Sequence, residues 1–190
     1  RASQLYREGR YDEYARLYLK NYETTRDLVF RTSLREPTEE EKKNWSPIMP
    51  ICEECGRIAT TVVTSHDDGS YAYACKKDVG YAKGCSHNGS GRIEDHKYKI
   101  IWRLDWPSRQ AFLNVSAEGG GVDHFTRGGC CDTAQAVHKE LLERESPVGY
   151  RYGFLLFHGK KYSKSKGIGI DAEKLLRLVP PQLVKYYLFR

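Results

Sequence analysis

Two groups of cysteines in the first half of the chain have the residue type and spacing of a metal site. Cys52 and Cys55 enclose two residues, and Cys75 follows after 19 more. A C-x2-C turn points two thiolates at one tetrahedral Zn²⁺, and a second group closes the shell. Because nine residues separate Cys75 from Cys85, the fourth ligand is either Cys85 or His87. Buried free thiols are the alternative, but a small module without a secretory signal favours zinc, held in a closed site that is structural rather than catalytic.

A loop rich in lysine and serine lies in the last third of the chain. Residues 160–167 read KKYSKSKG and follow an apolar run. Positive charges and hydroxyls at the carboxyl end of a strand suit a triphosphate, because ligands of open α/β sheets bind outside that edge. A solvated basic turn is the commoner meaning of such a run. The residues alone therefore leave a phosphate site and a surface turn open.

Three shorter stretches add candidate binding groups. Asp123 and His124 follow a run of three glycines, and residues 128–133 (GGCCDT) lead from a glycine turn into a helix start, where free N–H groups favour an anion or a ribose hydroxyl. Residues 102–107 (WRLDWP) place two indoles and a carboxylate where a strand is expected to end at a proline. Each stretch alone is more typical of a turn, a cap or core filler. Together they form a candidate site.

Residues 1–47, which we call the helical connector, are expected to form helices. Apolar side chains recur at helical spacing over residues 11–29 and predict one long amphipathic helix. Gly9 separates it from a short preceding helix. Thr38 and Glu41 have the spacing of a capping box, which begins one more short helix.

Residues 48–101 are expected to form a small β-rich module. A module of about fifty residues buries too little surface to be stable without a covalent or metal cross-link. Its cysteines are the obvious candidates for forming that cross-link. The composition predicts strands at residues 58–64, 71–75 and 98–102 and tight turns at residues 67–70 and 88–91.

The last region, residues 102–190, alternates strand and helix. An apolar strand is predicted over residues 150–158, and Asp132, Asp171 and Pro181 each begin a helix. Strands that are apolar on both faces and alternate with helices indicate a parallel sheet covered on both sides.

The composition limits the classes of protein. A chain of 190 residues with 39% apolar residues can build one packed domain with a smaller insert. A net charge of +6 favours a polyanionic partner. The longest apolar run, residues 154–157, is far shorter than the roughly 18 residues of a membrane span, and the chain shows no signal-peptide core. These features predict a soluble, cytoplasmic protein that does not act at a membrane.

In chain order, these motifs resemble those of the class I lysyl-tRNA synthetases of the archaeal type. Residues 161–167 are similar to the KMSKS signature of class I synthetases, with Tyr162 in place of methionine. The W-R-x-D-W-P stretch narrows the family, although glutamyl-tRNA synthetases carry a similar one. The motifs that carry the resemblance are Cys52-x2-Cys55, residues 102–109, Asp123-His124, residues 128–133 and residues 161–167.

The resemblance implies the fold and the activity. We expect an α/β protein in which residues 102–190 are the second half of a Rossmann-type catalytic domain. Residues 48–101 would be an inserted zinc module that contacts the acceptor stem of tRNA(Lys), and residues 1–47 the helical connector. The implied reaction is the ATP-dependent activation of lysine to lysyl-adenylate and its transfer to tRNA(Lys), with Mg²⁺ and a structural Zn²⁺ as cofactors.

The resemblance also implies the roles of single residues. Lys164 would stabilise the charge that builds on pyrophosphate as it leaves, while Lys161, Ser163 and Ser165 would shape the loop and hold phosphates. The residues implied to line the adenylate pocket are Asp123, His124, Asp132 and Thr133, and those on the amino-acid side are Trp106 and Tyr152.

Two parts of the family pattern do not occur in these 190 residues, namely the HIGH tetrapeptide and a C-terminal anticodon-binding helical domain. We therefore expect the chain to be the middle portion of a longer enzyme and to form no adenylate by itself. The alternatives are a glutamyl-tRNA synthetase-like enzyme and a non-catalytic zinc module that binds RNA. Activity with lysine or glutamate, and protection of Lys164 by ATP, separate them.

Overall fold

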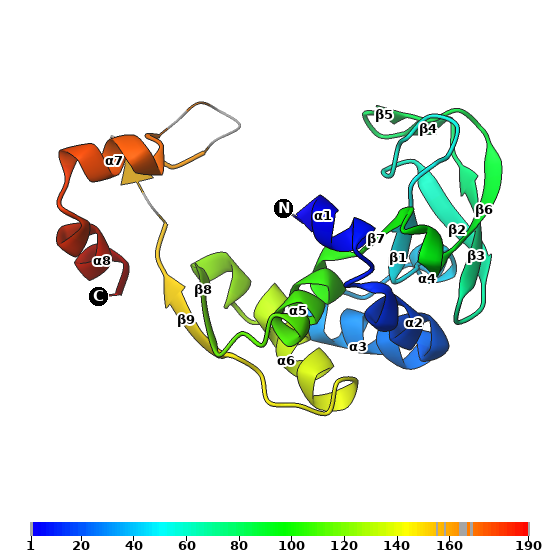
Figure 1. Ribbon diagram of the computed structural model, residues 1–190, viewed down its shortest axis with the longest axis horizontal. Helices are drawn as coiled ribbons and strands as arrows, with labels where there is room; N and C mark the ends of the chain where they lie inside the picture. The colour runs from blue at the N-terminus through cyan, green and yellow to red at the C-terminus, as the bar shows by residue number, and fades with distance from the viewer. Residues whose placement is uncertain (1, 155, 158, 164–166, 168, 190) are drawn as a thin grey trace.

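The fold places a group of helices between a β-rich lobe and a C-terminal arm (Figure 1). The computed structural model describes residues 2–154, 156–157, 159–163, 167 and 169–189, without the side chains of residues 157, 188 and 189. Among the described residues, every helix is too short or too polar to cross a lipid bilayer.

The helical connector contains more helices than the sequence predicted. The single helix expected over residues 11–29 is wrong, because the chain bends at Asn21, which has φ −104° and ψ 39°. The backbone N–H of Asn21 still makes the last helical bond of α2, to the Leu17 carbonyl at 3.0 Å, and the Asn21 amide side chain donates to the same carbonyl at 2.9 Å. The Thr38–Glu41 capping box is confirmed. The four helices are α1 (Ala2–Arg7), α2 (Asp12–Lys20), α3 (Tyr22–Ser33) and α4 (Glu39–Asn44).

The β lobe, residues 48–100, is built from antiparallel strands. The turn predicted at residues 67–70 is confirmed, since the Asp67 carboxylate accepts hydrogen bonds from the backbone N–H groups of Gly69 and Ser70. The strands are β1 (Ile48–Pro50) paired with β7 (Tyr98–Ile100), the three-stranded sheet β2 (Thr61–His66), β3 (Ser70–Cys75) and β6 (Asn88–Arg92), and the hairpin β4 (Asp78–Val79) with β5 (Ala82–Lys83).

The turn predicted at residues 88–91 is wrong, because these residues lie in strand β6. Gly89 is paired with Tyr73 and Gly91 with Tyr71 on β3. A Cβ atom at Gly89 would lie 2.6 Å from the Tyr73 hydroxyl, and one at Gly91 would lie 2.7 Å from the Tyr71 hydroxyl. These glycines therefore make room for two tyrosine rings across the strands.

The strand expected to extend to residue 102 ends instead at Ile100, and Trp102 begins a helix. The N–H groups of Leu104 and Asp105 donate to the Ile101 carbonyl, at 2.9 and 2.8 Å, which starts helix α5 (Trp102–Phe112). Both indoles of the W-R-x-D-W-P stretch thus project from a helix.

The remaining part of the fold is mixed α/β. Strand β8 (Ala117–Gly121) runs parallel to β9 (Val148–Tyr152), and helix α6 (Cys130–Glu140) lies between them in sequence. The parallel pairing agrees with the prediction. The described side chains of β9 are largely exposed, so the expected cover on both faces is not formed by the described part of this chain. The helix cap predicted at Asp132 is wrong, because the N-cap of α6 is Gly129, three residues earlier, and Asp132 lies in the first turn of the helix.

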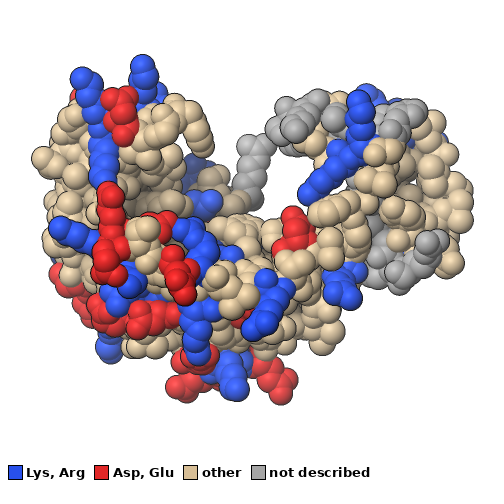
Figure 2. All heavy atoms as spheres, turned by 180° about the vertical axis from the view of Figure 1, so that it is seen from behind, with Lys and Arg blue, Asp and Glu red and all other residues tan. Residues whose placement is uncertain are grey.

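The apolar strand predicted over residues 150–158 is divided into two. After β9 the chain forms β10 (Leu156–Phe157), which pairs with β11 (Lys160–Lys161). Helix α7 (Ala172–Leu178) starts at the predicted Asp171 cap, whose carboxylate accepts from the Lys174 N–H at 2.8 Å, and α8 (Pro181–Phe189) starts at Pro181. We call β10, β11, α7 and α8 the C-terminal arm, and Figure 2 shows that the molecule is hollowed between this arm and the β lobe.

The core lies where α2, α3 and α5 meet strands β1 and β7. Its largest fully buried side chains include Tyr11, Tyr18, Ile100 and Leu104. The hydroxyl of Tyr18 forms a 2.9 Å hydrogen bond with the Ser108 hydroxyl, so its one polar atom is satisfied. This core fixes α5, the helix that carries the aromatic residues of the candidate site.

Candidate active-site cleft and thiol cluster

A cleft of about 400 Å³ lies at the carboxyl ends of the parallel strands β8 and β9. Ligands of open α/β sheets bind outside this edge, because the loops that follow the strands converge there. Helix α5 forms one wall, and β11 of the C-terminal arm forms the opposite rim. The lining residues are Trp102, Trp106, Arg109, Glu118, Gly119, Gly120, Gly121, Asp123, His124, Tyr152, Gly153, Phe154, Lys161 and Tyr162.

Aromatic rings form the wall of the cleft on α5. Trp102 and Trp106, one helical turn apart, stack with their ring centroids 6.1 Å apart and an interplanar angle of 10°. The ring of His124 lies 5.8 Å from that of Trp106. Trp106 is buried, whereas Trp102 is exposed, so the indole wall reaches from the protein interior to solvent.

A carboxylate that the sequence analysis did not single out, Glu118, lies against this wall. Its Oε2 atom accepts hydrogen bonds of 2.7 Å from Trp106 Nε1 and from Gln110 Nε2. The one sequence signal for Glu118 was its position just before the run of glycines, which is weak without knowledge of what faces it.

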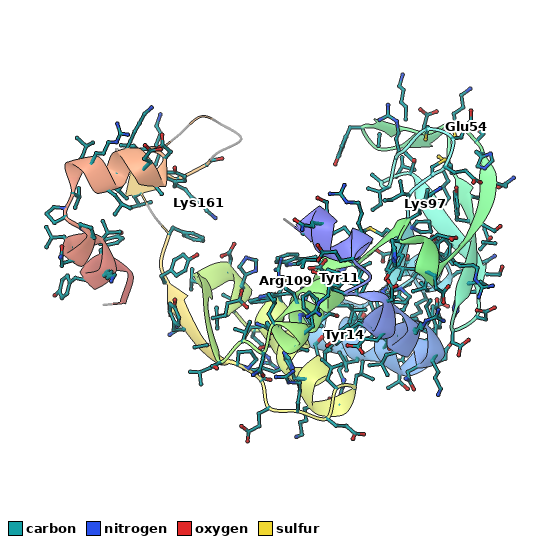
Figure 3. The ribbon with its side chains drawn as sticks, in the orientation of Figure 1. Tyr11, Tyr14, Glu54, Lys97, Arg109 and Lys161 are labelled. Carbon is teal, nitrogen blue, oxygen red and sulfur yellow. The ribbon has the colours of Figure 1, made fainter. Side chains whose placement is uncertain are left out.

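Two cations approach the cleft from different elements. The Lys161 ammonium lies 3.6 Å from the centroid of the Phe154 ring, and the Arg109 guanidinium lies 5.6 Å from that of Trp102. Figure 3 shows Lys161 on the C-terminal arm and Arg109 on α5. Cation–π contacts of this kind hold a charged group in place without neutralising it.

The structure brings together five of the residues predicted from the sequence. They come from α5, from the segment after β8, from the last position of β9 and from β11. Ser163 lies beyond β11 and does not contribute to the described cleft wall, and Lys164 and Ser165 lie outside the described residues. The five residues are Trp106, Asp123, His124, Tyr152 and Lys161.

Asp132 and Thr133 lie away from the cleft, at the start of α6. Asp132 Oδ2 accepts a 2.8 Å hydrogen bond from the Gly128 N–H. Thr133 is fully buried, and its hydroxyl bonds Thr32 at 2.8 Å and accepts from Arg103 at 2.7 Å. These two side chains therefore hold the helix start in place, and the described wall of the cleft does not contain them.

The carboxylate of the W-R-x-D-W-P stretch, Asp105, faces the core instead of the cleft. It is buried and accepts hydrogen bonds from the hydroxyls of Tyr6, at 2.6 Å, and Tyr11, at 3.3 Å. Burial, together with the negative charge of Asp105, raises the pKa of both tyrosines, so both remain protonated donors at neutral pH. The role of Asp105 in this structure is to anchor α1 and α2 to α5.

The four predicted cysteine ligands form a second cluster, in the β lobe. The Sγ atoms of Cys52, Cys55, Cys75 and Cys85 all lie within 4.8 Å of one another. Cys52 and Cys85 are 3.6 Å apart, and Cys55 and Cys75 are 3.8 Å apart. Tetrahedral Zn–S bonds of about 2.3 Å would place sulfurs about 3.8 Å from one another, so the arrangement fits Zn²⁺.

The cluster contains Cys85 and not the alternative His87. The ring of His87 instead pairs with the Glu53 carboxylate at 2.8 Å. The residues between Cys75 and Cys85 form the β4–β5 hairpin, which returns the chain to the cluster. Gly84 is needed for this return, because a Cβ there would lie 2.2 Å from the Lys76 carbonyl oxygen and 2.7 Å from Cys75 Sγ.

The electrostatics of the cluster also fit a cation. The pKa values of two of the thiols move in opposite directions. Although desolvation opposes the shift, hydrogen bonds from the Thr60 hydroxyl and the Cys85 N–H lower the pKa of Cys75 to about 6. Although the backbone N–H of His87 opposes the shift, desolvation and the three neighbouring thiols raise the pKa of Cys85 to about 12. Four thiolates this close repel one another unless a cation sits among them. The donor set of four sulfurs is the one that Zn²⁺ takes in structural sites.

Comparison with known proteins places these features in a family. The family model described as tRNA synthetases class I (K) matches residues 1–190, and the chain belongs to this family. The resemblance to class I lysyl-tRNA synthetases is thereby confirmed.

Individual relatives give the same result. The chain is 35% identical to the lysine–tRNA ligase of Archaeoglobus fulgidus, in a match that covers 100% of this chain and 36% of that protein. It is 32% identical to the lysine–tRNA ligase of Methanosarcina barkeri and 31% identical to that of Thermoplasma acidophilum, over 100% of this chain and 34% and 35% of those proteins. The chain thus spans about a third of the length of the relatives it matches.

Proposed function

We propose that this chain supplies part of the active site of an enzyme that activates lysine with ATP and transfers it to tRNA(Lys) in the cytoplasm. One observation carries the proposal. Four residues from three separate motifs (Trp106, Asp123, His124 and Lys161) converge with Tyr152, which the family resemblance implied, in one cleft at the edge of a parallel strand pair where α/β proteins bind ligands. Family membership supports the same conclusion.

In the proposed reaction the lysine carboxylate attacks the α-phosphorus of ATP, and pyrophosphate leaves as lysyl-adenylate forms. The task of the protein is to stabilise negative charge on the leaving group, and a lysine that stays protonated suits it. Lys161, held over Phe154 at the rim of the cleft, would bind phosphate oxygens. Lys164 and Ser165, with Ser163, keep the roles that the sequence resemblance implies. Mg²⁺ would enter with the triphosphate and neutralise part of its charge.

The pocket itself would be divided between the adenylate and the amino acid. Asp123 and His124, which follow β8, would contact the adenylate, whereas Trp106 and Tyr152 would flank the amino-acid side. Asp132 and Thr133 would contribute indirectly, because their hydrogen bonds hold the start of α6 in place. We propose that residues 102–190 form the second half of a Rossmann-type domain.

The thiol cluster would hold a structural Zn²⁺ that stabilises residues 48–101 as a module. The β4–β5 hairpin beyond the cluster carries a fully exposed tyrosine, Tyr81, with exposed Lys77 and Lys83 near it in sequence. An exposed ring and cations suit a nucleic-acid backbone and its unpaired bases. We propose that this hairpin contacts the acceptor stem of tRNA(Lys). Figure 2 shows basic and acidic side chains interspersed over one face of the molecule, so a local contact fits better than a broad basic surface.

The test is amino-acid-dependent ATP–pyrophosphate exchange by the full-length protein that contains this chain, with lysine and glutamate compared at saturating ATP. We expect exchange with lysine and none with glutamate. Exchange with glutamate instead of lysine would favour a glutamyl-tRNA synthetase-like enzyme. RNA binding without exchange for either amino acid would favour a non-catalytic module.

A further inference from the structure

A chain of hydrogen bonds runs behind the cleft, from the interior of the protein to its aromatic wall. Glu118 Oε2 accepts from Trp106 Nε1 and from Gln110 Nε2, each at 2.7 Å. Because a carboxylate only accepts, these contacts require the amide nitrogen of Gln110 to face Glu118. The Gln110 amide oxygen then faces the opposite way, towards His138.

His138 completes the chain. Its Nε2 atom lies 3.0 Å from Gln110 Oε1, and its side chain is fully buried. Since the amide oxygen can only accept, Nε2 must carry the proton. The other nitrogen, Nδ1, is buried and has no partner among the described residues, so a proton there would be an unsatisfied donor. The arrangement therefore selects the neutral imidazole with its proton on Nε2.

We infer that Gln110 and His138 are positioning residues, which hold the Glu118 carboxylate so that it orients the Trp106 indole and presents its second oxygen to a primary ammonium group of the amino-acid substrate. Neither Gln110 nor His138 would touch the substrate. The part that concerns the substrate rests on the proposed function, whereas the part that concerns the indole does not.

The form of the cleft supports an ammonium ligand. Glu118 lines the cleft and is partly buried. Among the described residues, its Oε1 atom accepts no hydrogen bond. An indole beside a carboxylate with an open oxygen suits a group that is aliphatic along its stem and cationic at its end. An ammonium is such a group, with three donors and no acceptor.

The experiment uses variants that keep the shape of a side chain and remove its hydrogen bonds. His138→Met and Gln110→Met remove links of the chain, whereas His138→Gln keeps a donor near the position of Nε2. The first measurement is the indole N–H signal of Trp106 in ¹⁵N–¹H spectra, identified by Trp106→Phe and compared with that of Trp45. The second is lysine affinity in the full-length protein, compared with ATP affinity.

We expect His138→Met and Gln110→Met to move the Trp106 signal and to leave that of Trp45 in place. We expect them to weaken lysine binding about tenfold, with ATP affinity within about twofold of wild type. His138→Gln, which keeps a donor, should leave both the Trp106 signal and the lysine affinity close to those of the wild type. Glu118→Gln should weaken lysine binding at least as much as the two methionine variants.

The inference is overturned if both methionine variants leave the Trp106 signal unchanged, or if lysine and ATP affinities fall together. Two variants are used because one of them could fail to fold, which circular dichroism would reveal. If the wild-type protein binds ATP but no lysine, the proposed function and the ammonium role both fail. The Trp106 signal still decides whether Gln110 and His138 position the indole.

Discussion

The Sγ atoms of Cys52 and Cys85 lie 3.6 Å apart, although 33 positions separate them in the chain. The β4–β5 hairpin closes this distance and explains why the second cysteine group is wider than a C-x2-C turn. The spacing that left the fourth ligand open therefore has a structural cause.

If the cluster holds zinc, the purified protein should contain one Zn²⁺ per chain. Cys75→Ser should lose the metal and unfold the β lobe, because the binding energy of a structural metal is also folding energy. Cys130→Ser, outside the cluster, is the matched control and should keep the metal. Elemental analysis together with circular dichroism measures both properties. Zinc retained by Cys75→Ser would contradict the assignment.

Gly84→Ala should impair the same site without removing a ligand. Its Cβ would have to displace the Lys76 carbonyl or the Cys75 sulfur. We expect faster zinc release to a chelator and a lower melting temperature. Gly153→Ala, where a Cβ would meet nothing within 4 Å, is the control for the substitution itself. Equal release rates in the two variants would show that the close approach at Gly84 does not matter.

Asp105 is expected to matter for stability. Asp105→Asn places an amide donor against two tyrosine hydroxyls that now donate to the carboxylate. We expect a loss of about 1–3 kcal/mol in the free energy of unfolding, measured in urea. The exposed Asp68→Asn is the control and should change it by less than about 0.5 kcal/mol. A loss of lysine affinity without a loss of stability would mean that Asp105 serves the site directly.

The buried His138 should make the protein sensitive to acid. Desolvation, helped by the charge of Arg144, lowers its pKa from 6.5 to about 4. The unfolded chain then binds the proton more readily than the folded protein, so stability is lost as the pH falls from about 6.5 towards 4. The loss attributable to His138 is about 3 kcal/mol in total. As the pH decreases, the free energy of unfolding should fall less steeply in His138→Gln than in the wild type. Identical slopes in the two proteins would contradict this.

Local chemistry allowed part of the fold to be predicted. The Thr38–Glu41 box, the turn at Asp67 and the cap at Asp171 depend on side chains that bond backbone groups within three residues, so their sequence is sufficient. The bend at Asn21 was missed because the apolar stripe continues across it. The non-helical ψ of Asn21, whose side chain bonds the Leu17 carbonyl, leaves no trace in that periodicity.

Tertiary contacts decided the rest. Residues 88–91 have the composition of a turn, but their glycines accommodate Tyr71 and Tyr73 on the neighbouring strand. Trp106, Asp123, His124 and Lys161 could be predicted because they lie in motifs whose order along the chain resembles that of the family, and Tyr152 was implied by that resemblance alone. Glu118 could not, since its importance comes from Trp106 and Gln110, which lie on a different element.

The most direct test of the central claim, that the cleft activates lysine, is the rate of lysine-dependent ATP–pyrophosphate exchange in full-length Lys161→Ala. Lys139→Ala, an exposed lysine on α6 outside the cleft, is the matched control. We predict that the Lys161 variant loses about tenfold to hundredfold in kcat, because a charge that stabilises the leaving pyrophosphate is gone, and that the Lys139 variant matches the wild type. Equal rates in all three proteins would contradict the account.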